Sequence, residues 1–205
     1  MKTLKRLFDV LVSSLLLLVL SPLLVLIALV IRLDSPGPAL FRQERLGQDQ
    51  GEFTIFKFRT MHHRTRLDQL REAVVESDVD PRITRVGRFL RKASLDELPQ
   101  LINVVKGDMS LVGPRPVLPE QLRAIPDEHM DRFTMKPGIT GLAQVRGRRS
   151  LNWLEQLRYD SEYCRNWSFL LDLKILGQTV WVVLTGQGVY GTKEDNWRNY
   201  INKGV

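Results

Sequence analysis

The sequence is poor in cysteine: Cys164 is the only one among 205 residues. A lone cysteine cannot form an intramolecular disulfide, and no C-x-x-C pair is available to hold zinc. This composition fits a protein whose folded body faces a reducing compartment. The phosphate-binding loop G-x-x-x-x-G-K-[ST] is also absent, so a phosphorylated ligand would have to bind by other means.

Positive charge is in excess, with 30 Lys and Arg against 23 Asp and Glu and a net charge of +7. Such an excess predicts an acidic partner, which could be nucleic acid, anionic lipid headgroups or a phosphorylated substrate. Charge alone does not choose among these three. The length allows one domain with a hydrophobic core and, in addition, one membrane anchor.

The longest uncharged run extends from Val10 to Ile31. As a helix it is long enough to cross the ~30 Å hydrocarbon layer of a bilayer. A cleaved signal peptide is the alternative, but its apolar part is usually about 7–15 residues long, which is shorter than this run. The sequence therefore predicts a membrane segment.

Ser21-Pro22 lies near the middle of this run, where the proline removes one helical hydrogen bond and should kink or break the helix. A sharp break would form a hairpin that dips into one leaflet, whereas a kink alone would leave a spanning helix. Basic residues collect on the cytoplasmic side of membranes. Here they stand on both flanks of the run: Lys2, Lys5, Arg6, Arg32, Arg42 and Arg45. This distribution favours the hairpin, although both shapes are compatible with the physics.

The rest of the chain predicts an α+β fold that is mostly helical, with a small β-hairpin formed by residues 39–45 and 51–61. The stretches expected to be helical are 64–75, which could instead be mobile, 85–91, 94–106, 151–164 and 169–184. Proline and glycine in 113–116 and 137–141 predict rigid loops. The apolar spacing in 169–184 predicts a core helix, and a position partly in the membrane interface is the alternative.

Asp96 and Glu97 form the most suggestive pair of acidic residues. On a helix, adjacent side chains point about 100° apart, so one carboxylate could face a phosphorus atom while the other holds a metal ion. A structural alternative is a capping box, because Ser94 and Glu97 match the S-x-x-E pattern. A helix that begins around Pro99 would instead leave the pair just ahead of a positive helix end.

Several basic residues stand in constrained backbone contexts. Strand periodicity places Lys57 and Arg59 on one face. Arg115 lies between two prolines, which would present its guanidinium to a phosphate at little entropic cost. Arg148 follows the 137–141 loop and adds phosphate-binding capacity, and Arg91 belongs to a basic series that could meet lipid headgroups or solvent.

Asp160 and Asp172 are candidates for positioning a metal ion or an arginine. The alternative for each is a helix cap, since most aspartates at helix ends are caps.

Six motifs in this order resemble those of the bacterial sugar transferases known as monotopic phosphoglycosyl transferases. They are Lys5-Arg-Leu-Phe-Asp9, Ser21-Pro22 in its apolar run, Phe56-Lys-Phe-Arg-Thr-Met61, Ser94-Leu-Asp-Glu-Leu-Pro-Gln100, Gly107-Asp-Met-Ser-Leu-Val-Gly-Pro-Arg-Pro116 and Lys136-Pro-Gly-Ile-Thr-Gly-Leu-Ala-Gln144. The resemblance extends from about Lys5 to Gly188. It implies three parts: a re-entrant membrane anchor at 1–33 broken at Ser21-Pro22, a catalytic domain at 34–188 with interfacial amphipathic helices, and an extension at 189–205 of open role.

The resemblance also implies an activity on the cytoplasmic face of the bacterial inner membrane. Asp96 would attack the β-phosphorus of a UDP-sugar and release UMP, and undecaprenyl phosphate would then take the sugar phosphate. Glu97, together with Asp96, would hold Mg²⁺. The residues expected to bind substrate are Lys57, Arg59, Arg91, Arg115, Arg148, Asp160 and Asp172. The expected partners are the two substrates, membrane phospholipid and a second copy in a homodimer, but not nucleic acid.

Two other functions are compatible with the same composition. One is a membrane-tethered module that binds anionic lipid or nucleic acid, in which the carboxylates only cap helices. The other is a catalytically silent scaffold for envelope polysaccharide assembly.

Overall fold

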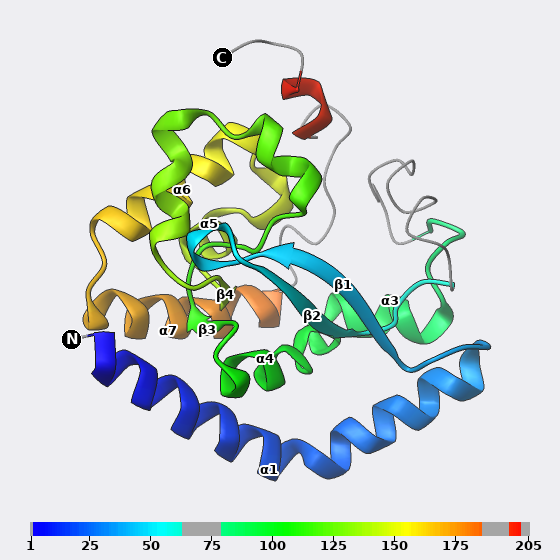
Figure 1. The fold of residues 1–205 in the computed structure, drawn as a ribbon. Helices are drawn as coiled ribbons and strands as arrows, with labels where there is room; N and C mark the ends of the chain where they lie inside the picture. Colours follow the sequence, from blue (N-terminus) through cyan, green and yellow to red (C-terminus); the bar gives the residue numbers. More distant parts are fainter. Residues whose placement is uncertain (1, 63–78, 186–196, 202–205) are drawn as a thin grey trace.

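A computed structural model describes residues 2–62, 79–185 and 197–201. A long bent helix lies along one side of the molecule, and a β-hairpin and shorter helices form the body above it (Figure 1). The fold is mostly helical with small sheets, as the sequence predicts. The expected helix at 64–75 and most of the expected extension at 189–205 lie outside the described residues.

Helix α1 (Lys2–Asp34) contains Pro22 in its interior. It bends near its middle, so its two arms run in different directions (Figure 1). The hydroxyl of Ser21 donates to the Leu18 carbonyl, 2.8 Å away, within the turn that the proline disrupts. The predicted kink is therefore present, although the helix is not interrupted. By length and composition, Thr3–Asp34 is the one helix in the described part of the chain that could cross a membrane.

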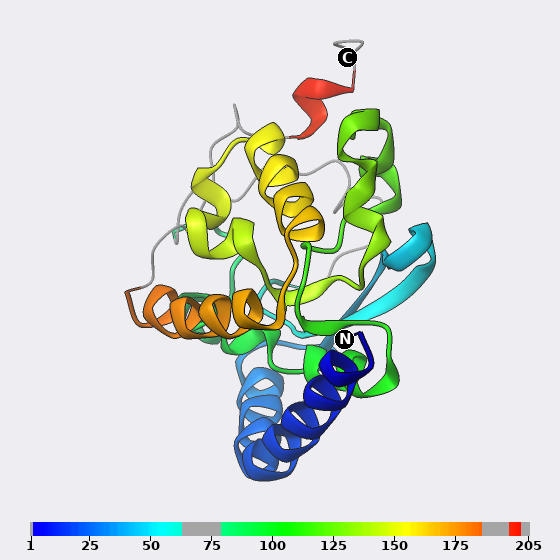
Figure 2. The same ribbon diagram turned by 90° about the vertical axis from the view of Figure 1, so that its left-hand side faces the viewer.

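Both ends of α1 are attached to the same body (Figure 2). Near its start, the Lys5 ammonium donates to Asp172 at 2.6 Å and to the Val112 carbonyl at 3.0 Å. Near its end, Ile27 and Ile31 pack in a cluster with Phe58 and other apolar side chains. The bend between these two attachments points away from the body.

The hairpin pairs β1 (Leu40–Leu46) with β2 (Glu52–Phe58) in antiparallel register, with Leu40 opposite Phe58 and Leu46 opposite Glu52. This agrees with the prediction to within a few residues. A second sheet was not predicted: β3 (Ser110–Val112) and β4 (Gly138–Thr140) pair in parallel. Strands of three residues are too short to give a recognisable alternation in sequence.

The helices predicted at 85–91, 151–164 and 169–184 form close to their expected limits, whereas the helix predicted at 94–106 begins only at Gln100, after a separate 3₁₀ turn. The α-helices of the body are α3 (Arg85–Lys92), α4 (Gln100–Lys106), α5 (Leu142–Arg146), α6 (Trp153–Arg165) and α7 (Phe169–Thr185). The 3₁₀ segments are η1 (Gln48–Gln50), η2 (Leu95–Glu97), η3 (Pro119–Ala124), η4 (Asp127–Thr134), η5 (Arg148–Ser150) and η6 (Trp197–Tyr200).

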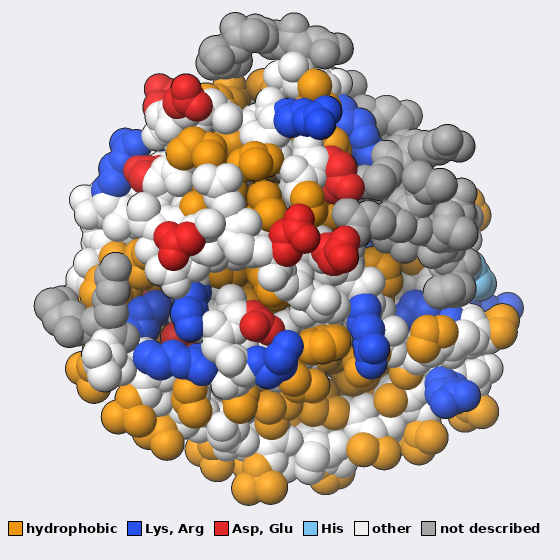
Figure 3. Space-filling view, in the orientation of Figure 1, with side chains coloured by type: hydrophobic (Ala, Val, Ile, Leu, Met, Phe, Trp, Pro, Cys, Tyr) orange, Lys and Arg blue, Asp and Glu red, His pale blue; other side chains and the backbone are white. Residues whose placement is uncertain are grey.

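Helix α7 differs from the core helix that its sequence favours, because only one side of it is buried. Ile175 is fully buried, whereas Leu170, Trp181 and Leu184 are 75%, 67% and 77% exposed. Side chains of α1 and α4 are exposed and apolar too, and apolar side chains cover the lower part of the face drawn in Figure 3. We call the surface formed by the exposed apolar side chains of α1, α4 and α7 the apolar face. Basic side chains gather just above its edge (Figure 3).

Candidate active site

The acidic pair lies on a 3₁₀ turn rather than inside a helix. Asp96 and Glu97 belong to η2, and α4 begins three residues after Glu97. The capping box is not formed, because the Ser94 hydroxyl makes no capping bond to the turn. Instead that hydroxyl accepts a hydrogen bond from the Arg148 guanidinium at 2.9 Å. The pair therefore lies ahead of α4, as the second structural alternative predicts.

Ser94 and Arg148 both have left-handed backbone conformations, each with φ of 55°. Such conformations are uncommon for residues other than glycine. They destabilise the folded state, and contacts with the surrounding structure must offset that cost. The two residues are 54 positions apart in sequence and are joined by a hydrogen bond beside the acidic pair. Strained residues of this kind concentrate in functional sites. The contact between Ser94 and Arg148 therefore marks the neighbouring Asp96–Glu97 pair as a candidate site.

Two cations converge on Glu97. The Lys57 ammonium lies 2.7 Å from Glu97 Oε1, and the Arg115 guanidinium lies 3.4 Å from the same oxygen. Burial lowers the pKa of Lys57 below its ordinary value of 10.5, and the negative charge of Glu97 opposes this change. Arg115 is also held close enough to Lys57 to lower the pKa of the lysine further.

Arg148 completes a group of three cations around the carboxylates. Burial lowers the pKa of its guanidinium, whereas the charges of Glu97 and Asp96 raise it. A site with two adjacent carboxylates and three cations suits a substrate with several phosphate charges, because the cations neutralise phosphate oxygens. The structure thus brings together five of the predicted site residues: Asp96, Glu97, Lys57, Arg115 and Arg148.

The loop that carries Arg115 is fixed by glycine contacts. A Cβ atom at Gly113 would lie 2.3 Å from the Lys136 carbonyl oxygen, and one at Gly138 would lie 2.1 Å from the Gly113 nitrogen. These distances are too short for any side chain, so only glycine lets the two segments approach backbone to backbone. The loop predicted at 137–141 is in fact largely strand β4. The contact brings Gly107–Pro116 and Lys136–Gln144, two of the recurring motifs, together.

Arg59 contacts the end of α1 rather than the acidic pair, and Arg91 lies close enough to Asp80 to affect its pKa. Arg59 is only 4% exposed, and it donates to the carbonyl of Ile31 in the last turn of α1 and to those of Ser35 and Pro36 just after it. Arg91 lies in the last turn of α3. Its charge helps to lower the pKa of Asp80 to about 2, a change caused mainly by hydrogen bonds from Arg82.

Asp160 and Asp172 are both buried and paired. Asp160 accepts from Arg132 at 2.7 Å, and burial raises the pKa of its carboxyl while Arg132 opposes that change. Asp172 accepts from Lys5, from the Tyr163 hydroxyl at 2.7 Å and from the Trp167 indole at 3.1 Å. Neither aspartate has the bond of a simple helix cap.

Ser94 and Arg132 have direct contacts with predicted site residues, yet sequence reasoning did not assign a role in the site to either. Arg132 has no motif around it that singles it out. Ser94 stands within the Ser94–Gln100 motif, so its closeness to Asp96 was the available signal.

A magnesium ion would fit this set of donors. Among the described residues, no group of three or more His, Cys, Asp or Glu is clustered in a way that could hold a metal ion by itself. Mg²⁺ usually binds through one or two carboxylates and completes its coordination with water and substrate phosphates. Asp96 and Glu97 provide two carboxylates beside the cations, which matches that mode of binding.

The fold and site thus define a protein with an exposed apolar face and an acidic pair surrounded by three cations. Comparison with known families places it further: the Bacterial sugar transferase family matches residues 1–186, and the chain belongs to this family.

Three curated relatives illustrate the match. A protein of Komagataeibacter xylinus named undecaprenyl-phosphate glucose phosphotransferase is 46% identical over 86% of this chain and 35% of its own length. The uncharacterized sugar transferase EpsL of Bacillus subtilis is 42% identical over 98% of this chain and 97% of its own length. A Caulobacter vibrioides protein named UDP-glucose:undecaprenyl-phosphate glucose-1-phosphate transferase is 47% identical over 91% of this chain and 72% of its own length. The chain therefore spans about a third of the first relative and nearly all of the second.

Proposed function

We propose that this protein transfers a sugar 1-phosphate from a UDP-sugar to undecaprenyl phosphate. The observation that carries the proposal is the convergence of Lys57, Arg115 and Arg148 on the Asp96–Glu97 pair. The names of the relatives support the reaction class, because several are undecaprenyl-phosphate transferases for glucose or galactose. Such a transfer would begin the assembly of a polysaccharide or glycoconjugate on its lipid carrier.

In the first step, an oxygen of Asp96 attacks the β-phosphorus of the UDP-sugar. A bond forms between that oxygen and phosphorus, and the bond from the β-phosphorus to the bridging oxygen of UMP breaks. UMP leaves with the bonding electrons, and the sugar phosphate remains on the aspartate. Covalent catalysis of this kind divides one difficult displacement into two easier ones.

In the second step, a phosphate oxygen of the lipid carrier attacks the same phosphorus. The bond to Asp96 breaks, which regenerates the carboxylate and yields undecaprenyl diphosphosugar. Lys57, Arg115 and Arg148 neutralise the phosphate charges in both steps. Glu97 and Asp96 would hold Mg²⁺, which offsets negative charge on the leaving group when it is bound.

The membrane arrangement is also part of the proposal. We assign α1 as a hairpin that enters the bilayer from the cytoplasmic face and returns to it, in the bacterial inner membrane. Three features support this: the bend at Pro22, the attachment of both ends of α1 to one body, and the exposed apolar face. The carrier lipid presents its phosphate only at the membrane surface, so this arrangement keeps the acidic pair within its reach.

The test is a transfer assay with purified protein, Mg²⁺, undecaprenyl phosphate and a panel of radiolabelled UDP-sugars. We expect lipid-linked label and equimolar UMP with at least one sugar, and we expect Asp96→Asn to abolish both. In the absence of undecaprenyl phosphate, the wild type should release at most one UMP per protein and retain the label. Full activity in Asp96→Asn would remove Asp96 as the nucleophile, and absence of turnover with every sugar would favour the scaffold.

A further inference from the structure

Outside the acidic pair, Arg132 and Asp160 form a buried ion pair next to the segment that carries Arg115. Arg132 belongs to η4 and is 3% exposed, and Asp160 belongs to α6 and is 2% exposed. Their side chains meet at 2.7 Å, and the Arg132 guanidinium also lies 5.2 Å from the centre of the Phe133 ring. A buried ion pair of this kind adds little to stability once its desolvation is counted, so its geometry is the more informative property.

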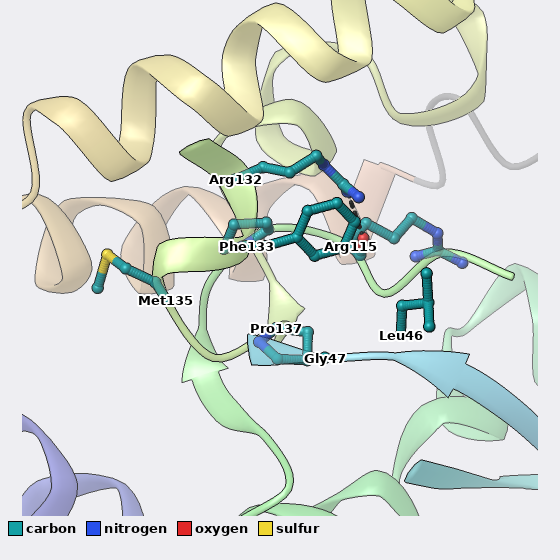
Figure 4. Close-up of a pocket in the computed structure, with 8 residues that line it drawn as sticks. Leu46, Gly47, Arg115, Arg132, Phe133, Met135 and Pro137 are labelled. Carbon is teal, nitrogen blue, oxygen red and sulfur yellow. Dashed lines mark hydrogen bonds between the residues drawn. The ribbon is translucent and has the colours of Figure 1, made fainter. Parts of the chain in front are cut away.

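The same nitrogen of Arg132 that reaches Asp160 also donates to the main-chain carbonyl of Arg115, at 2.6 Å. Figure 4 shows this bond, with the side chain of Arg115 extending away from Arg132. The Arg115 guanidinium points toward Glu97, and Arg132 binds the main chain of Arg115 on the opposite side. A small cavity beside this contact is lined by Leu46, Gly47, Pro114, Arg115, Arg132, Phe133, Met135 and Pro137.

Every residue from Gly113 to Val117 is tied to a neighbouring segment through its main chain. The partners, in order, are the Thr140 carbonyl, the Gly138 N–H, the Arg132 guanidinium, the Arg45 guanidinium and the Leu46 N–H. Arg132 is the one member of this series that is itself buried and paired with an opposite charge. Its position is therefore set by α6 through Asp160.

We propose that the Arg132–Asp160 ion pair is a positioning device that fixes Arg115 for contact with the phosphate groups of the substrate. The inference rests on the proposed function, because Arg115 acts on the nucleotide sugar. Arg132 binds the main chain of Arg115, and Asp160 binds Arg132, so both act through Arg115 and are positioning residues. Misplacing a phosphate-binding group by about 1 Å can cost on the order of a hundredfold in rate.

The test is a double-mutant cycle with Arg132→Gln, Arg115→Gln and the double variant, measured as kcat/KM for the UDP-sugar. If Arg132 acts through Arg115, Arg132→Gln lowers kcat/KM by about tenfold or more in the wild type, chiefly by raising KM, and has little effect in Arg115→Gln. Asp160→Asn, which removes the negative charge opposite Arg132, should follow the same pattern. If Arg132→Gln lowers kcat/KM equally in the wild type and in Arg115→Gln, the proposal is overturned. Equal losses would mean that Arg132 acts independently of Arg115, for example through a general loss of folded protein.

A second measurement does not depend on turnover. We expect hydrogen exchange at the amides of Arg115, Val117 and Leu118 to be faster in Arg132→Gln than in the wild type, with exchange in α1 unchanged. Arg132→Lys, which keeps a cation against Asp160, replaces Arg132→Gln if the latter does not fold. Unchanged exchange at these amides would contradict the positioning role. If the wild type transfers no sugar phosphate but exchange still changes, the proposed function fails while the attachment of Arg115 stands.

Discussion

At the scale of single residues, the ion pair between Lys57 and Glu97 joins the β-hairpin to the acidic pair. Lys57 lies at the end of β2, where strand periodicity turns it to the same side as Arg59. Only Lys57 reaches the acidic pair, because Arg59 donates to carbonyls at the end of α1. Glu97 opposes the effect of burial on Lys57, yet the pKa of the lysine remains below 10.5.

This lowered pKa predicts the alkaline limit of activity. Lys57 is charged below its folded-state pKa and loses its proton as pH rises through that value, so kcat/KM should fall at a pH below 10.5. Arg keeps its charge at any such pH. Lys57→Arg should therefore move the alkaline limb of the pH profile upward, even if its maximum rate is lower.

Lys57→Gln is the matched control for this pH profile. It removes the charge at every pH, so we expect kcat/KM to be lower by about a hundredfold and the alkaline limb due to this residue to be absent. Steady-state assays from pH 6 to pH 10.5 would measure all three proteins. An alkaline limb at the same pH in Lys57→Arg would assign the titration to another group.

At the scale of elements, α1 is the clearest case of one helix with two attachments. Its first arm is tied through Lys5 to Asp172 of α7, and its second arm packs against β2 and α3 near Ile31. Because these attachments lie on one body, a straight α1 would have to give up at least one of them. The proline and the attachments therefore favour the same bent shape.

Replacing Pro22 with alanine should shift the helix toward a straight, spanning form. We expect a cysteine at position 2 to react with a membrane-impermeant maleimide from outside spheroplasts more in Pro22→Ala than in the wild type. Adding Asp172→Asn, which weakens the attachment of Lys5, should increase the reaction further. Native Cys164 should interfere little, because burial raises the pKa of its thiol to about 12.

The control for this labelling is Leu23→Ala, which changes a neighbouring apolar side chain without restoring a backbone N–H. It should label as the wild type does. If position 2 stays protected in both Pro22→Ala and the double variant, the proline is not the decisive cause of the bend.

At the scale of the whole molecule, the apolar face and the rest of the surface have different compositions. The exposed apolar side chains of α1, α4 and α7 lie on one side, and η6 lies at the opposite end (Figures 1 and 3). Exposed apolar surface of this extent marks a site of contact with a membrane or another protein. The expected homodimer and the expected domain limits at 33 and 188 stay predictions.

Two tryptophans allow the orientation to be tested. Trp181 of α7 lies on the apolar face, whereas Trp197 of η6 packs against a core cluster at the far end. In vesicles of brominated phospholipid, we expect the emission of the wild type and of Trp197→Phe to be quenched. Trp181→Phe should lose most of that quenching. Undiminished quenching in Trp181→Phe would place the lipid contact on another surface.

The sequence alone determined those features that depend on neighbours in the chain. The kink at Pro22, the hairpin and the helices α3, α6 and α7 follow from proline chemistry and from periodicity, which operate over a few residues. The place of the acidic pair ahead of α4 was also among the alternatives that Pro99 allowed.

Tertiary structure decided which charges meet, because their partners are far apart in sequence. Lys57 and Glu97 are separated by 40 positions, and Arg132 and Asp160 by 28. No local pattern specifies such contacts, so the sequence could name Arg59, Asp160 and Asp172 but not their partners. It also could not predict the β3–β4 sheet, since that pairing exists only once the glycines of two distant loops allow their backbones to touch.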